Sequence, residues 1–224
     1  MKLILVTLLF FICNGCLYSQ QDEPTINTVD KQLANGQVTL SDILSNPVYM
    51  SFHSKTAFRE LIKKHAKAGK LIMVTEAEPG KKITVKGEIK TQAGIAINDA
   101  LLYVYHTSDK GWYSDTGAHI LQNEGDMNHA RLFGYLKTDG GGKFEFVTIQ
   151  PNGYPNSDLP AHIHIAVWKE GDLVEGVPGE LLFDEDPRLT PARKRSALNN
   201  GYLVEKNTGT LQSPVYNYSI VVRE

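Results

Sequence analysis

From residue 81 to its end, the chain consists of short β-type runs separated by clusters of turn-forming residues. Glycine, asparagine, aspartate and proline are concentrated between the runs, where tight turns favour them. Many short strands at roughly regular spacing predict a sandwich or barrel and argue against an α/β fold. We therefore predict an all-β sandwich over residues 81–224, with strands at 82–90, 100–107, 131–138, 143–149, 161–168, 180–183, 202–205 and 215–222.

Residues 20–80 are polar and mixed in composition. Within them, apolar side chains recur at helical spacing and predict a helix near 55–68. A single short helical turn is expected before Pro47, and another at 190–200 with Thr190 as its N-cap. The sequence thus predicts a helical N-terminal extension in front of the sandwich.

The first residues have the pattern of a secretory signal peptide. Lys2 is followed by an apolar run at 3–13, too short to span a bilayer, and then by small and polar residues. We predict a signal peptide over residues 1–19, an exported protein and no transmembrane span. Lipidation at Cys16 is the alternative, because that residue follows a glycine as at the end of a bacterial lipobox. Both cysteines lie in or beside this segment, so no disulfide framework is expected.

The length of 224 residues suits one full-sized domain with a real core. A formal net charge of −2 argues against a nucleic-acid partner, which would require a basic surface. Whether the chain forms a homo-oligomer stays open at this level.

Two histidines, His162 and His164, stand one residue apart in an apolar run. In a strand they point to the same face, while Ile163 points to the other. Such a pair is a candidate metal site, for which zinc, ferrous iron and ferric iron are all open. Tyr154 lies in a turn eight residues upstream, and Tyr113 follows a Ser-Asp-Lys-Gly turn. A tyrosine titrates at about 10, so only a strongly charged metal keeps it ionised at neutral pH; a plain surface tyrosine is the alternative for Tyr113.

Four segments carry a resemblance to a known family: "VKGEIKTQAGIAINDALLYVYHTSDKGWY", "YLKTDGGGKFEFVTIQPNGYP", "LPAHIHIAV" and "LLFDEDP". Together they resemble the intradiol ring-cleavage dioxygenases, non-haem ferric enzymes that open catechols between their two hydroxyls. The resemblance runs from about Lys82 to the C-terminus. It implies a β-sandwich, an Fe(III) cofactor, and a catechol-type substrate cleaved with O₂ to a muconate-type diacid.

Carried over by position, the resemblance implies four iron ligands: Tyr113, Tyr154, His162 and His164. The two tyrosines are also the implied catalytic residues, because the one like Tyr154 leaves the metal when substrate binds. All four residue types are present in this chain.

Two pocket positions depart from the family pattern. Leu159 stands where the family usually has an arginine, and Glu180 where it has a glutamine. Arg131 could supply a compensating charge, although a solvent-facing strand arginine is the plainer interpretation. His119 lies in the loop beyond Tyr113 and would either line the substrate pocket or face solvent.

These departures keep a second function open: a non-catalytic, secreted β-sandwich that binds a ligand or partner and shares only ancestry with the family. A cupin-like metal enzyme also contains an H-x-H pair. It needs a third histidine in a later strand, and no histidine follows His164.

Overall fold

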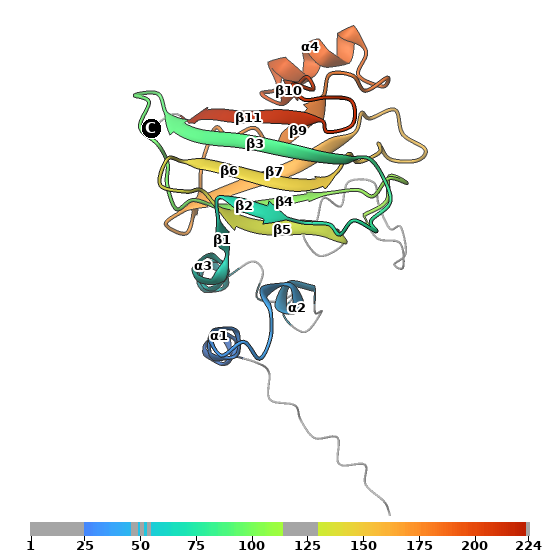
Figure 1. Ribbon diagram of the computed structural model, residues 1–224. Helices are drawn as coiled ribbons and strands as arrows, with labels where there is room; N and C mark the ends of the chain where they lie inside the picture. Colours follow the sequence, from blue (N-terminus) through green and yellow to red (C-terminus); the bar gives the residue numbers. More distant parts are fainter. Residues whose placement is uncertain (1–24, 46–48, 50–51, 53–54, 114–129, 223–224) are drawn as a thin grey trace, which may run out of the picture.

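The structure is a computed structural model that describes residues 25–45, 49, 52, 55–113 and 130–222. Two β-sheets dominate it (Figure 1). The larger sheet contains β1 (Lys67–Ala68), β4 (Leu101–His106), β5 (Leu132–Lys137), β7 (His162–Lys169), β8 (Asp172–Leu173), β9 (Glu180–Phe183) and β10 (Leu203–Glu205). The smaller sheet contains β2 (Lys70–Ile72), β3 (Lys82–Thr91), β6 (Lys143–Ile149) and β11 (Val215–Val222).

The strand order is β1-β5-β4-β7-β9-β10 in the larger sheet, with β8 paired to β7, and β11-β3-β6-β2 in the smaller one. Both sheets are mixed. The central pairs β4–β5, β4–β7, β7–β9 and β3–β6 are antiparallel, whereas β1, β10, β11 and β2 pair in parallel. The predicted all-β sandwich is confirmed.

The inner faces of the two sheets form the main hydrophobic core. Alternate residues of each strand point inward, as the two-residue period of a strand requires. In β7, Ile163, Ile165 and Val167 are buried in this core, and Val85 and Phe146 meet them from the smaller sheet. Burial of this alternating set fixes the register of β7 and therefore the face on which its other residues lie.

Helices α1 (Ile26–Ala34), α2 (Leu40–Ser45) and α3 (Thr56–His65) pack on the outer face of the larger sheet. In α3, Phe58, Leu61 and Ile62 form an apolar stripe that is buried in a second cluster with Tyr103 and Tyr135 of the sheet. The amphipathic period of α3 thus finds its partner in the outward-facing aromatic residues of β4 and β5.

Helix α4 (Pro191–Asn199) covers the opposite part of the same sheet, beside β10 (Figure 1). The Thr190 side chain accepts a hydrogen bond from Arg193 N and caps the helix, with Pro191 in its first turn. Ala197 packs with Leu182 and Leu189 in a small apolar cluster. The sequence predicted one turn here, and the structure extends it to 9 residues.

All eight predicted strands are present, and β1, β2 and β8 were not anticipated. Each of these is two or three residues long, too short for a period-2 pattern to be recognised. β1 and β2 lie within the stretch assigned to the N-terminal extension and contribute one strand to each sheet. The predicted signal peptide lies outside the described residues, and within those residues no helix is both long and apolar enough to span a bilayer.

Candidate metal centre and active-site cavity

Two tight turns at one end of the sandwich bring Tyr113 and Tyr154 together. Gly111 has a φ of +82°, and a Cβ on it would lie 2.3 Å from the carbonyl oxygen of Gly153. Only glycine combines this backbone conformation with so close an approach. The two turns therefore pack directly against each other, and each one delivers its tyrosine to the same place.

The two histidines reach that place from β7. His162 and His164 occupy the outer face of the larger sheet, because Ile163 and Ile165 between and beyond them are buried in the core. Tyr105 is the cross-strand neighbour of His164 and stacks on its ring, with centroids 4.5 Å apart and planes 10° from parallel. The stacking holds the His164 ring in one orientation.

Four donor atoms from these side chains form a closed ring of short contacts. Tyr113 Oη lies 2.6 Å from Tyr154 Oη and 2.9 Å from His164 Nε2. His162 Nε2 lies 3.2 Å from Tyr154 Oη and 3.1 Å from His164 Nε2. Donors bound at about 2 Å to one ion stand about 3 Å from their neighbours. The four-donor cluster therefore fits a single metal ion.

The backbone sets which nitrogen of His162 faces the cluster. His162 Nδ1 lies 2.9 Å from the carbonyl oxygen of Pro160, which can only accept, so Nδ1 carries the proton. Nε2 then presents its lone pair to the other donors. A histidine ligand fixed in this way by its second nitrogen is typical of metal sites.

Burial controls the protonation of the cluster. It raises the pKa of Tyr113, and the hydrogen bond between Tyr113 and Tyr154 adds to that effect. Burial likewise raises the pKa of Tyr154. It lowers the pKa of His164 to about 3, assisted by the charge of His162. Without a cation the phenols keep their protons and the His164 imidazole stays neutral, so binding of a highly charged ion would release the phenolic protons.

A segment after β9 holds the loop that connects the second tyrosine to the first histidine. Asp186 accepts hydrogen bonds from Ala161 N through Oδ2 and from Arg188 N through Oδ1, both 2.7 Å long. The Arg188 guanidinium donates to Tyr154 O at 3.3 Å and to Leu159 O at 3.5 Å. We refer to Asp186 and Arg188 as the loop clamp. It acts on backbone atoms of the loop and not on the donor atoms themselves.

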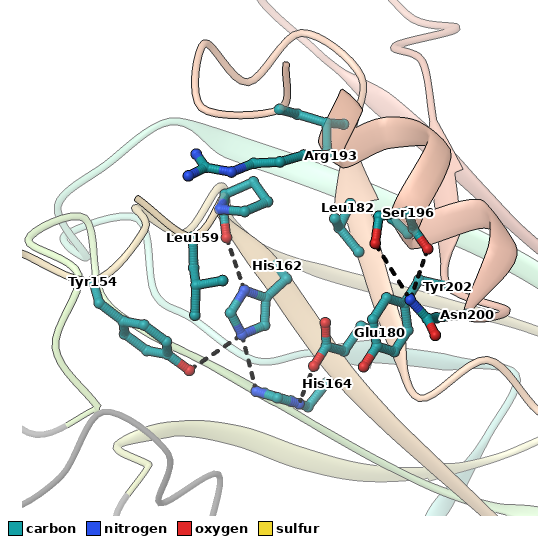
Figure 2. A pocket seen from close by; sticks show the side chains of 13 residues that line it. Tyr154, Leu159, His162, His164, Glu180, Leu182, Arg193, Ser196, Asn200 and Tyr202 are labelled. Carbon is teal, nitrogen blue, oxygen red and sulfur yellow. Dashed lines mark hydrogen bonds and ion pairs between the residues drawn. The ribbon is translucent and has the colours of Figure 1, made fainter. Parts of the chain in front are cut away.

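A cavity of about 380 Å³ opens beside the cluster (Figure 2). Tyr154, His162 and His164 form one end of it. Its other walls combine apolar residues with Glu180 of β9 and with polar residues of α4 and the turn after it. The apolar residues are Leu159, Pro160, Leu182, Leu189 and Ala197, and the polar ones on the α4 side are Arg193, Ser196, Asn200 and Tyr202.

A second set of donors overlaps the four-donor cluster. Ligand atoms of His162, His164 and Glu180 all lie within 4.8 Å of one another. Glu180 Oε1 lies 3.8 Å from His164 Nδ1, whereas His164 Nε2 faces Tyr113. Glu180 is thus on the opposite side of the His164 ring from the tyrosines, and the set with the two tyrosines has the shorter mutual distances.

Of the other residues that the sequence predicted to border the substrate, two line the cavity and one does not. Leu159 and Glu180 line the cavity, and the Leu159 side chain is 48% exposed at its rim. Arg131 is not among the described residues that line the cavity; its guanidinium makes a bidentate pair with Glu78, with both contacts 2.8 Å long. His119 lies outside the described residues.

Sequence reasoning missed the contribution of α4. Arg193, Ser196 and Asn200 line the cavity, and the loop clamp lies just before the helix. Polar residues on a short helix resemble an ordinary solvated face. The only signal was the proximity of an Asp-Pro-Arg turn to the predicted helix, which gives no information on where that helix packs.

The fold and the four-donor cluster define a class: two-sheet sandwiches with two tyrosines and two histidines converging beside a cavity. A family model described as "Dioxygenase" matches residues 56–223. The chain belongs to this dioxygenase family, and the resemblance to the intradiol ring-cleavage dioxygenases is confirmed. It is 27% identical over 164 residues to the protocatechuate 3,4-dioxygenase beta chain of Burkholderia cepacia, which covers 67% of this chain and 68% of that one.

Solved structures of related proteins share the fold. An intradiol ring-cleavage dioxygenase from Tetranychus urticae superposes with a TM-score of 0.53 at 17% identity, covering 70% of this chain and 87% of that chain. Hydroxyquinol 1,2-dioxygenase from Pseudomonas putida DLL-E4 gives 0.51 at 19% identity, covering 70% and 61%. At these identities the likeness concerns architecture alone.

Proposed function

We propose that the protein is a non-haem ferric intradiol dioxygenase that cleaves a catechol-type ring between its two hydroxyls with O₂ to give a muconate-type diacid. The observation that carries this proposal is the convergence of Tyr113, Tyr154, His162 and His164 at one end of a cavity. Family membership supports the same chemistry.

The donor set fits ferric iron. Two phenol oxygens are hard donors that favour a trivalent ion, and two imidazoles complete the set. When bound, the ion would supply Lewis-acid activation of the catechol toward O₂. The four side chains named above would hold the ion. Binding and orientation of the substrate and transfer of its protons would be carried out by residues of this chain.

Tyr154 is the residue best placed to move a proton. Its Oη contacts both Tyr113 Oη and His162 Nε2 and stands at the cavity end. Because burial raises the pKa of Tyr154, its phenolate is a strong base that can take a proton from a catechol hydroxyl. His162 keeps its orientation meanwhile through its Nδ1–H hydrogen bond to Pro160 O.

The cavity walls suit a flat aromatic ring. Leu159, Leu182 and Leu189 offer apolar surface on which a ring can pack while its hydroxyls point to the donor end.

Oxygen consumption tests this function directly. Ferric-loaded protein should consume one O₂ per catechol and yield a ring-opened diacid, identified by mass spectrometry. The His162→Ala variant is the control, because it should neither retain iron nor consume O₂. Intact catechols with no O₂ uptake by iron-loaded protein would reject the proposal.

A second function has one observation in its favour. Leu159 and Glu180 replace an arginine and a glutamine of the family pattern in the cavity wall. A protein that has exchanged pocket residues in this way could bind a ligand without turning it over. Binding of a catechol with no O₂ uptake in the experiment above would favour this non-catalytic binding protein.

We also propose that residues 1–19 act as a secretory signal peptide. N-terminal sequencing of the protein recovered from fractionated cells tests this. A mature chain beginning near Gln20 supports it, a lipid-modified Cys16 indicates the anchored alternative, and an intact Met1 rejects both.

A further inference from the structure

Glu180 places a carboxylate in the cavity wall beside the candidate metal centre. It is the first residue of β9 and pairs across the sheet with His164 on β7. Its side chain is 25% exposed. Figure 2 shows the carboxylate between His164 and the residues of the α4 side, so it borders the space that a ligand of the metal centre would enter.

Among the described residues, no cation neutralises this carboxylate. Its single ion-pair partner is His164, with Oε1 and Nδ1 3.8 Å apart, which is too long for a hydrogen bond. A histidine that ligates a metal is neutral, so His164 offers no positive charge when it serves as a ligand.

Arg193 is the one cationic side chain among the described cavity-lining residues, and its charge is directed elsewhere. Its guanidinium donates to the carbonyl oxygens of Asp158 and Arg188 and pairs with Asp158 Oδ2 at 3.3 Å. Figure 2 shows the side chain extending toward Leu159 and away from Glu180. Among the cavity-lining residues that the structure describes, Glu180 is therefore the one whose charge has no opposite charge beside it.

The surroundings of Glu180 are suited to a ligand cation. A partly buried carboxylate is costly unless it is paired, and a positive group on a ligand would supply the missing partner. The residues that follow it around the wall, Ser196, Asn200 and Tyr202, carry hydroxyl and amide groups that can accept further hydrogen bonds from an ammonium. The apolar leucines on the other walls leave room for the ring itself.

Resting on the proposed function, we propose that the substrates are catechols bearing an ammonium group on a short side chain, and that Glu180 selects them. The side chain must be short, because a carboxylate oxygen of Glu180 lies within 4.8 Å of ligand nitrogens of both histidines. A catechol carrying a carboxylate would meet like charge at the same place and would be disfavoured.

Three probes of one shape test this selection: 3,4-dihydroxybenzylamine, 4-methylcatechol and 3,4-dihydroxybenzoate. Their dissociation constants are measured by calorimetry on ferric-loaded protein without O₂, so that binding is recorded apart from turnover. Charge-assisted hydrogen bonds contribute about 1.5–3 kcal/mol, so the amine should bind about tenfold or more tighter than the methyl compound. The carboxylate should bind more weakly than either.

The Glu180→Gln variant should bind the amine and the methyl compound within about twofold of each other and should keep its iron. Glu175→Gln is the matched control, because it removes the same charge from an exposed position outside the cavity and should preserve the wild-type preference.

The outcomes separate this inference from the function on which it rests. Equal binding of the three probes to the wild-type protein would overturn the inference and leave a catechol dioxygenase intact; this comparison needs no variant. Loss of iron from Glu180→Gln would also overturn it, because Glu180 would then be a ligand. Absence of binding by every probe would reject the proposed function itself.

Discussion

The outer face of the larger sheet has two halves that share the same strands and serve different purposes. At one end, Leu101 and Trp168 face each other across β4 and β7 under helices α1–α3. At the other end of the same pair, Tyr105 faces His164 beside the cavity. We call these the helix-covered half and the donor half. The strand alternation is identical in both halves. The difference lies in what each half faces: helices α1–α3 cover one half and stabilise the fold, whereas the other half borders the cavity.

The boundary between the halves is a continuous stack of aromatic rings. Tyr103 packs on Tyr135 at 4.6 Å and on Tyr105 at 5.0 Å, and Tyr105 in turn stacks on His164. The donor half is therefore supported from the side by the apolar half. A rigid neighbouring layer of this kind is what a precisely placed set of ligands requires.

The largest effect is expected from a substitution in the donor half, which should reduce iron binding without unfolding the protein. Replacing His164 with alanine removes one of four donors and should lower the bound iron more than 100-fold, measured by metal analysis after dialysis. The free energy of unfolding of the metal-free protein should change far less than the iron content, because the His164 ring lies outside the main hydrophobic core and has Tyr105 as its stacked neighbour. Full iron retention by this variant would contradict the four-donor cluster.

A core substitution in the helix-covered half should show the reverse behaviour. Phe58 on α3 is fully buried, so Phe58→Ala should lower the free energy of unfolding by about 3–5 kcal/mol. Urea denaturation of the metal-free protein measures this loss. Iron bound per folded molecule should stay at the wild-type level. If iron falls in proportion to stability, the two halves are not separable.

Acid should destabilise the sandwich near the donor half. His106 at the end of β4 is fully buried, and burial lowers its pKa to about 4. In the unfolded chain this histidine has a pKa of about 6.5. Between pH 6.5 and 4 it therefore binds a proton in the unfolded chain but not in the folded state. Stability is therefore complete above pH 6.5 and should fall by about 3 kcal/mol as the pH approaches 4.

Unfolding curves of wild type and His106→Gln at pH 7, 5.5 and 4.5 measure this linkage. The variant should lose less stability over the same range, because glutamine does not titrate. An equal decline in both proteins would assign the acid sensitivity to other groups.

A smaller effect is expected from the loop clamp. Asp186→Asn leaves only one oxygen to accept the two backbone N–H groups that the carboxylate now holds. Loss of an outer-shell partner that bonds a ligand directly typically costs 10–100-fold in metal affinity. The loop clamp bonds only backbone atoms of the loop, so we expect a loss of about tenfold, at the low end of that range. Iron affinity should fall by that factor with the fold retained, whereas the exposed Asp172→Asn should bind as wild type. Unchanged affinity in Asp186→Asn would show that the loop positions its ligands without the clamp.

The two halves also differ in how far sequence alone predicts them. Short strands separated by turn clusters were enough to predict the sandwich, and the alternation in β7 placed His162 and His164 on one face. The full set of four donors was implied only by the resemblance to the intradiol dioxygenases. The convergence of three separate segments depends on the close packing of Gly111 against Gly153. The two glycines are far apart in the sequence, so no local sequence pattern predicts this contact. The place of α4 could not be predicted either, because its polar residues line a cavity and not open solvent.

The visible absorption spectrum of the ferric-loaded protein tests the central claim most directly. Two tyrosinates on one ferric ion should give a coloured protein with a charge-transfer band. Tyr113→Phe and Tyr154→Phe should each shift and weaken the band, and the double variant should abolish it. A protein that binds ferric iron but stays colourless, or one whose colour survives both substitutions, would contradict the convergence of two phenolates and two imidazoles on one metal ion.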